Sequence, residues 1–175
     1  IKAENGELLA ISMPLYDLHV DFSVIEKEIF DNNINELAAR FSKLLKKDEG
    51  LVKKEFLKAK ESNKKYYPIA KKVNHIDLQK IKKLPIFIHG QNKGGLIIEK
   101  RTNRQKPYGI LASRTIGILR DENPVGIERS FNKNLSGTNG IQLKQNIGKN
   151  RWISKKSEAN MNPIAGNDIV TTINI

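Results

Sequence analysis

The first part of the chain shows the period-two alternation of apolar and polar residues that is typical of half-buried β-strands. Asn5-Gly6 indicates a tight turn. Strands are then predicted over residues 8–12 and 15–22, separated by Pro14. In the second strand two sets of residues alternate. The inward-facing set is Tyr16, Leu18, Val20 and Phe22, and the outward-facing set is Asp17, His19 and Asp21.

The pattern changes to helical spacing over residues 30–88. Asn33 followed by Glu36 resembles a helix start, and Leu37, Phe41, Leu44 and Leu45 then share one helical face. A second helix is predicted after Asp48, with Val52, Phe56 and Ala59 buried, and it should break before Pro68. A third helix is predicted over residues 77–84, buries Ile81 and Leu84, and ends at Pro85.

The remaining segments return to β-patterns around two short helices. A strand is predicted over 96–101, and Pro107 should open a helix that buries Ile110, Leu111, Thr115, Ile116 and Leu119. Ile127, Phe131 and Leu135 predict a further helix, ended by Gly137. Strands follow over 141–147, 152–154 and 169–175. The predicted class is α+β: a β-rich body from distant parts of the chain, whose end strands pair, with a helical subdomain inserted at about 30–88.

Composition refines this picture. The 175 residues can bury a core of their own, but only 38% are hydrophobic and 29% are charged, so an elongated body with much surface is expected. No apolar run is long enough to span a bilayer. The chain has no cysteine, and its three histidines (His19, His75 and His89) are scattered, so we expect neither a metal site nor a cofactor.

The net charge of +12 is concentrated in one segment. Residues 43–83 hold 14 lysines and 5 acidic residues, which gives +9 of the total, and they contain no arginine. Arginine is favoured for bidentate contacts to phosphate and guanine, so a lysine-only surface favours a solvated helix face. A basic nucleic-acid-binding protein that uses the Lys-rich helices 43–83 is the alternative interpretation.

An ordered set of residues in the middle third carries a resemblance to a known family. The segment 106–140 reads KPYGILASRTIGILRDENPVGIERSFNKNLSGTNG. With the preceding Arg104, its motif positions are Pro107, Gly109, Ala112, Gly117, Gly126, Glu128, Leu135, Gly137 and Gly140. This set resembles the signature of the non-catalytic N-terminal module of class B penicillin-binding proteins, the transpeptidases that cross-link peptidoglycan.

Both ends of the chain resemble the same family. Residues 1–22 are similar to the family's opening, and residues 162–175 to the strand that leads into the transpeptidase domain, through Pro163, Gly166 and Asp168. The sequence departs from the family at Lys106, where tyrosine is usual, and at Asn174, where aspartate is usual. The family's Arg-Gly pair is also absent before Ile1, which suggests a cut just inside the family's start.

The resemblance implies a function for the whole protein. Residues 1–175 would form the penicillin-binding-protein dimerisation domain, or pedestal, with the last strand (168–175) leading toward a transpeptidase domain. The full-length protein would be a D,D-transpeptidase of septal or side-wall peptidoglycan synthesis, anchored in the inner membrane by an upstream segment and facing the periplasm. Its partners would be its own transpeptidase domain, a glycan-polymerising membrane protein and other division or elongation proteins, with no nucleic acid.

Catalysis by this segment itself is not expected. Penicillin-interacting enzymes need Ser-x-x-Lys, Ser-x-Asn and Lys-Thr-Gly or Lys-Ser-Gly. Ser62 to Lys65 and Ser130 to Asn132 match the first two strings, but neither form of the third occurs. A serine acyl enzyme that uses Ser62 and Lys65 is therefore a weaker alternative.

Two further residues carry structural predictions. Glu128 follows a segment rich in arginine, so we expect an ion pair with Arg104, or failing that with Arg101 or Arg114. Trp152, the single tryptophan, either anchors a strand pair at a core edge or forms an exposed contact for a partner protein.

Overall fold

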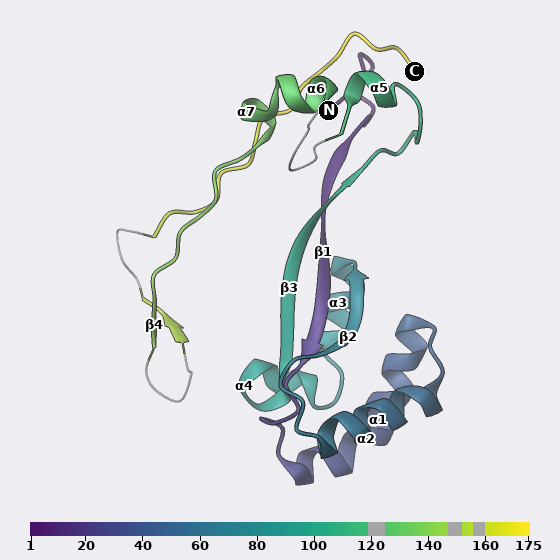
Figure 1. Ribbon diagram of the computed structural model, residues 1–175, viewed down its shortest axis with the longest axis vertical. Coiled ribbons are helices and arrows are strands. Elements are labelled where there is room, and N and C mark those ends of the chain that lie inside the picture. The colour runs from purple at the N-terminus through teal and green to yellow at the C-terminus, as the bar shows by residue number, and fades with distance from the viewer. Residues whose placement is uncertain (119–124, 147–151, 156–159) are drawn as a thin grey trace. The chain divides into compact units, whose positions relative to one another are not determined.

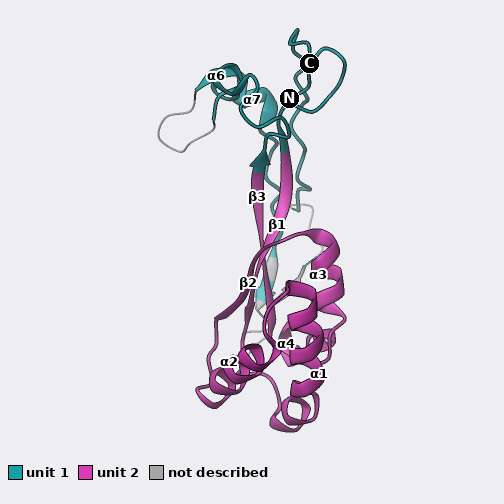
Figure 2. Ribbon diagram, turned by 90° about the vertical axis from the view of Figure 1, so that its right-hand side faces the viewer, with its two compact units in different colours: residues 1–11, 104–175 teal, residues 12–103 magenta. Residues whose placement is uncertain are grey.

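The chain forms two compact units in the computed structural model, which describes residues 1–118, 125–146, 152–155 and 160–175. Unit 1 comprises residues 1–11 and 104–175, and unit 2 comprises residues 12–103. Figure 2 shows that both boundaries fall within strands, β1 (Ile11–Val20) and β3 (Leu96–Gln105). The predicted α+β class is confirmed.

A three-stranded sheet of order β2-β1-β3 forms the centre of unit 2 (Figure 1). Strand β2 (Tyr67–Val73) runs antiparallel to β1, with Tyr16 opposite Val73 and Val20 opposite Tyr67. This strand lies inside the range 30–88, for which only helices were predicted, so that prediction was wrong in this part. Pro68 obscured the strand, but β2 lies at an edge of the sheet, where proline is tolerated.

Strand β1 differs from its prediction in two ways. It is one strand that passes through Pro14 without a break, because Pro14 is exposed and precedes Tyr16, the first residue paired with β2. Asp17 and His19 were predicted on the solvent face, yet both are buried. The alternation fails here because β1 is the central strand and polar partners from neighbouring strands cover its outer face.

Three helices of unit 2 follow the predicted faces. They are α1 (Lys27–Leu45), α2 (Glu49–Glu61) and α3 (His75–Lys82). Asp48 caps α2 as predicted, since its carboxylate accepts the N–H of Leu51 at 2.8 Å. The predicted start of α1 at Asn33 was wrong: the helix begins at Lys27, and the Asn33 amide donates to the carbonyl of Ile29 at 2.8 Å.

The core of unit 2 is a large apolar cluster between the sheet and these helices. A 3₁₀ turn (η1, Phe87–His89) and the short helix α4 (Gly90–Gly94) lead into β3. Five phenylalanine and tyrosine rings pack edge-on or tilted around the centre of this cluster: Phe22, Phe30, Phe41, Phe56 and Tyr67. No helix among the described residues has the length and apolarity needed to cross a lipid bilayer.

Unit 1 contains short elements: α5 (Ser113–Ile116), α6 (Gly126–Ser130), α7 (Asn132–Leu135), and the antiparallel pair β4 (Lys144–Asn146) and β5 (Trp152–Ser154). The prediction that Pro107 opens a helix was wrong, because residues 107–112 form turns. Ile110 is 91% exposed and Leu111 is also exposed, whereas Ile116 is buried. Leu119 and the side chain of Trp152 lie outside the described residues.

The predicted helix through Phe131 is divided there between α6 and α7. The C-terminal segment also differs from its prediction, since residues 169–175 form no strand. They pair with the N-terminal segment through a single parallel bridge between Lys2 and Val170. The N–H of Lys2 donates to the carbonyl of Ile169 at 2.8 Å, and the N–H of Thr171 donates to the carbonyl of Lys2 at 2.9 Å. The two ends of the chain therefore pair as expected, but by isolated backbone bonds.

Candidate functional site

The motif residues singled out from the sequence all lie in unit 1, between residues 104 and 168. Arg104 is the last residue but one of β3. Pro107, Gly109 and Ala112 lie in the turns before α5, and Gly117 follows α5. Gly126 and Glu128 lie in α6, and Leu135 ends α7. The remaining positions lie in two extended segments: Gly137 and Gly140 after α7, and Pro163, Gly166 and Asp168 near the C-terminus.

Arg104 and Glu128 form the expected ion pair. The Arg104 Nε donates to Glu128 Oε1 at 2.8 Å, and the side chains are 28% and 5% exposed. A carboxylate this deeply buried has lost most of its hydration, and the charge-assisted hydrogen bond from Arg104 replaces part of it. The two other arginines considered as partners of Glu128 lie elsewhere. Arg101 pairs with Asp17 in unit 2, at 2.7 Å, and Arg114 is exposed.

Gly117 and Gly126 bring two backbone segments into contact beside this pair. Both have positive φ angles, +80° and +69°. A Cβ on Gly117 would lie 1.8 Å from the carbonyl oxygen of Val125, and one on Gly126 would lie 2.5 Å from that of Thr115. Neither position can hold a side chain without moving the backbone, so these two motif glycines are required by packing.

Lys106, which departs from the family pattern, also takes part in this arrangement. Its Nζ donates to the carbonyl oxygen of Gly117 at 2.6 Å. The neighbouring Tyr108 hydroxyl donates to the carboxylate of Glu7, which lies on the N-terminal segment. That hydrogen bond raises the pKa of Tyr108, because it stabilises the protonated phenol beside a negative charge. We call Arg104, Lys106, Gly117, Gly126 and Glu128 the motif cluster.

A second close approach joins the segment after α7 to the C-terminal segment. A Cβ on Gly137 would lie 2.0 Å from the carbonyl oxygen of Ile164, and one on Gly166 would lie 1.9 Å from that of Leu135. Thr138 and Ile164 exchange two backbone hydrogen bonds of 2.9 Å, as do Ile141 and Met161. The motif glycines therefore mark places where extended segments from distant parts of the chain touch.

Asp168 fixes the C-terminal segment to the N-terminal one. Its Oδ2 lies 2.8 Å from Lys2 Nζ, and this hydrogen bond lowers the pKa of Asp168 from its usual value. Asp168 is largely solvated and Lys2 is partly exposed, so solvent screening keeps the energy of the pair small. Its position next to the Lys2–Val170 bridge makes it an accessory to the backbone pairing.

A comparison of the sequence with models of known protein families identifies the first two thirds of the chain. The sequence model of the penicillin-binding protein dimerisation domain matches residues 1–124. The chain belongs to this family. No curated protein sequence matches the chain.

Solved structures share the fold of this dimerisation domain. It is similar to penicillin-binding protein 2X from Streptococcus thermophilus, with a TM-score of 0.62, 20% identity, and coverage of 94% of this chain and 26% of that one. It is also similar to a peptidoglycan synthetase from Bifidobacterium adolescentis, with a TM-score of 0.55, 22% identity, and coverage of 99% and 34%. The dimerisation domain thus spans about a quarter to a third of those chains.

The serines considered for acyl chemistry, Ser62 and Ser130, both lie at exposed positions. Ser62 is the exposed residue that follows α2, and Lys65 is also exposed. No hydrogen bond among the described residues joins Ser62 to Lys65. The described ranges also contain no group of three acidic, histidine or cysteine residues arranged to hold a metal ion.

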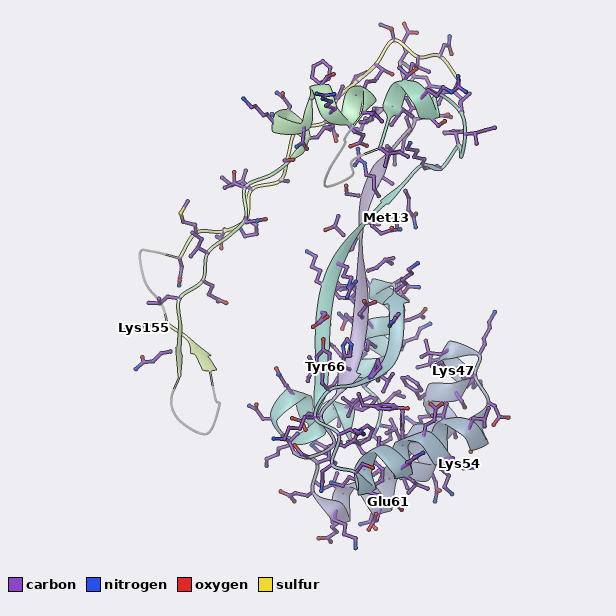
Figure 3. All side chains as sticks on the ribbon, viewed as in Figure 1. Met13, Lys47, Lys54, Glu61, Tyr66 and Lys155 are labelled. Atoms are coloured by element: carbon purple, nitrogen blue, oxygen red, sulfur yellow. The ribbon has the colours of Figure 1, made fainter. Side chains whose placement is uncertain are left out.

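Some lysines of the basic segment 43–83 have structural partners. Lys47, labelled in Figure 3, donates from Nζ to the carbonyl of Ile69 at 2.9 Å. Lys60 donates from Nζ to the carbonyl of Phe22 at 3.0 Å. Others, including Lys54, are exposed on the helix surface. The segment thus combines solvated lysines with lysines whose amines are hydrogen-bonded to backbone carbonyls.

Unit 2 contains polar contacts that the sequence analysis missed. The buried Asp17 accepts the backbone N–H of Lys72 at 2.9 Å and also pairs with Arg101. The buried His19 ring stacks on Tyr66, with centroids 4.0 Å apart, and the Tyr66 hydroxyl donates to Glu99. No sequence signal marked these residues, because period-two alternation assigned Asp17 and His19 to the solvent.

Proposed function

We propose that this dimerisation domain is the non-catalytic pedestal of a peptidoglycan D,D-transpeptidase. In this proposal an upstream segment anchors the protein in the inner membrane, and the pedestal lies on the periplasmic side. It holds a following transpeptidase domain in position and docks partners in septal or side-wall synthesis, among them a glycan-polymerising membrane protein. The observation that carries the proposal is the family match over residues 1–124, together with motif residues that act as packing contacts.

The motif cluster supports a mechanical role. The buried Arg104–Glu128 pair and the close backbone contacts at glycine make unit 1 stiffer, since each of these contacts is lost if the chain segments separate. The two similar structures, of which the domain spans 26% and 34%, support its place as one module of a larger protein. Neither a nucleophile nor a general base is needed for this role.

Labelling with a fluorescent penicillin tests whether acylation requires a part of the protein outside the 175-residue pedestal. The full-length protein should be acylated, and the 175-residue chain should not. Glu128→Ala in the full-length protein should retain acylation while it reduces peptidoglycan cross-linking in cells, because the pedestal is loosened and the acyl site is intact. Glu4→Ala, at an exposed position of unit 1, is the control and should affect neither.

Two results would contradict the proposal. Acylation of the 175-residue chain, abolished by Ser62→Ala, would instead identify a serine acyl enzyme. A full-length protein that no penicillin labels would exclude the transpeptidase assignment.

A further inference from the structure

A groove in unit 2 lies outside the motif cluster and has no role in the proposal above. It runs between α1 and α3, has a volume of about 570 Å³, and is lined by Arg40, Lys43, Leu44, Asp77, Lys80, Lys83 and Leu84. Helices α1 and α3 both belong to unit 2, so the groove lies within one compact body. We call it the α1–α3 groove.

The floor of the groove is apolar and fixed in place. Leu84 is buried and belongs to the core of unit 2, and Leu44 is half-buried and packs against that core. Leucine side chains held in this way present a preformed apolar surface. An apolar side chain of a partner would bury further area there with little ordering of the groove itself.

The rim of the groove is basic. Its four cations are all exposed: Arg40, Lys43, Lys80 and Lys83. The single acidic residue, Asp77, already accepts from the Asn74 amide at 2.9 Å and lies 3.6 Å from Lys80. Arg40 pairs with Glu36 at 2.6 Å, but both side chains are about half exposed or more, so the pair is easily exchanged.

We infer that the α1–α3 groove docks an acidic amphipathic segment of a partner protein. Apolar side chains of the segment fill the floor at Leu44 and Leu84, and its carboxylates face the four cations of the rim. The inference deepens the proposed function, on which it rests, because it specifies the chemistry of one docking partner of the pedestal.

The lining favours a peptide over a polynucleotide. It contains one arginine and no aromatic side chain, whereas strands of nucleic acid are held by stacking on aromatic rings as well as by phosphate contacts. The leucine floor has no counterpart in a sugar-phosphate backbone. A peptide with carboxylates around spaced apolar residues matches both features of the groove.

Selection from a phage-displayed library of random short peptides tests the inference. Three forms of the 175-residue chain serve as bait: the unchanged protein, Lys43→Glu with Lys83→Glu, and Lys64→Glu with Lys65→Glu. The last two carry the same change in net charge, but Lys64 and Lys65 are exposed residues outside the groove. All four lysines are exposed, so both variants should fold, and circular dichroism checks this.

The unchanged protein and the Lys64/Lys65 variant should enrich acidic peptides with spaced apolar residues. The Lys43/Lys83 variant should not. For an enriched peptide, fluorescence anisotropy should show binding about tenfold weaker to the Lys43/Lys83 variant. Replacing the apolar residues of the peptide by serine should abolish binding.

Three outcomes would overturn the inference. They are no enrichment by the unchanged protein, enrichment of peptides without acidic residues, and equal loss of binding in both charge variants, which would indicate attraction to the overall positive charge. None of these bears on penicillin labelling of the full-length protein, so failure here is distinguishable from failure of the pedestal proposal.

Discussion

Different kinds of contact stabilise the interior of each unit. Unit 2 has an extensive apolar core in which aromatic rings from two helices and the sheet interlock. Among its described residues, unit 1 has a small buried cluster: Ile1, Ala3, Leu9, Ala10 and Ile116. It relies in addition on the Arg104–Glu128 pair and on backbone contacts at glycine. The motif positions singled out from the sequence lie in the unit with the smaller described core, and at several of them the close backbone contacts leave no room for a Cβ.

The largest expected effect is a cavity in the core of unit 2. Phe41 is fully buried between Phe56 and Phe87, so Phe41→Ala should lower the free energy of unfolding by about 3–5 kcal/mol. Hydrogen exchange should show lost protection in α1, α2 and the sheet, with the backbone bonds of unit 1 retained. Leu51→Ala, at an exposed position of α2, is the control. Equal loss of protection in both units would show that they unfold together and would break the comparison.

Removal of the buried carboxylate of unit 1 should have the next largest effect. Glu128→Ala leaves Arg104 without its carboxylate partner and should cost about 2–4 kcal/mol, a figure reduced from that of a fully buried pair because Arg104 is partly solvated. Protection should be lost in α6 and in the Lys2–Val170 pairing, while α1 and α2 keep theirs. An unchanged melting temperature would show that the ion pair does not hold unit 1 together.

Comparing Gly117→Ala with a control variant distinguishes two sources of lost stability, a steric clash of the new Cβ and the strain of a positive φ angle. The new Cβ would meet the carbonyl of Val125, and the φ angle of +80° is unfavourable for alanine, so a loss of about 1–3 kcal/mol is expected. Gly109→Ala is the matched control, since Gly109 also has a positive φ, +59°, but open space around it. If both variants lose equal stability by chemical denaturation, backbone strain alone accounts for the loss at Gly117.

The smallest effects concern two tyrosine–glutamate pairs, one in each unit. Hydrogen bonds from Glu99 and Glu7 raise the pKa of Tyr66 and of Tyr108, respectively, above the usual value of 10.0. Because the folded-state pKa is raised, the protonated phenols stabilise the fold below pH 10, and this contribution is lost as the pH rises through the folded-state pKa.

Titration of tyrosine absorbance checks this. Glu7→Gln should lower the pKa of Tyr108 alone, and Glu99→Gln that of Tyr66 alone. A shift of both phenols in either variant would show that the two units are electrostatically coupled.

The sequence predicted the helical faces of unit 2 well and its sheet poorly. Apolar spacing located Phe41, Val52 and Phe56, because one side of each helix meets the core. Strand β2 was missed, since Pro68 reads as a break unless it is known that the strand lies at an edge. Asp17 and His19 were misplaced because alternation assumes a sheet with one solvated face, and their covering partners come from distant positions in the chain.

In unit 1 the resemblance to the penicillin-binding-protein family was a better guide than the local spacing of apolar residues. Periodicity predicted a helix after Pro107, where the structure has turns, yet the ordered motif pointed to Arg104 as the partner of Glu128. The roles of the motif glycines depend on contacts between segments far apart in sequence, which no local window contains. The roles proposed for the motif residues in the whole protein stay predictions.

The lysine amines of unit 2 should differ in reactivity, because two of them donate hydrogen bonds to backbone carbonyls. Lys47 and Lys60 hold backbone carbonyls of a neighbouring strand and loop, whereas Lys54 and Lys58 extend into solvent. An acylating reagent must reach the nitrogen of the amine, and in Lys47 and Lys60 that nitrogen is already in contact with a carbonyl oxygen. Surface-directed acetylation should therefore remove much of the positive charge of the domain before it modifies these two hydrogen-bonded lysines.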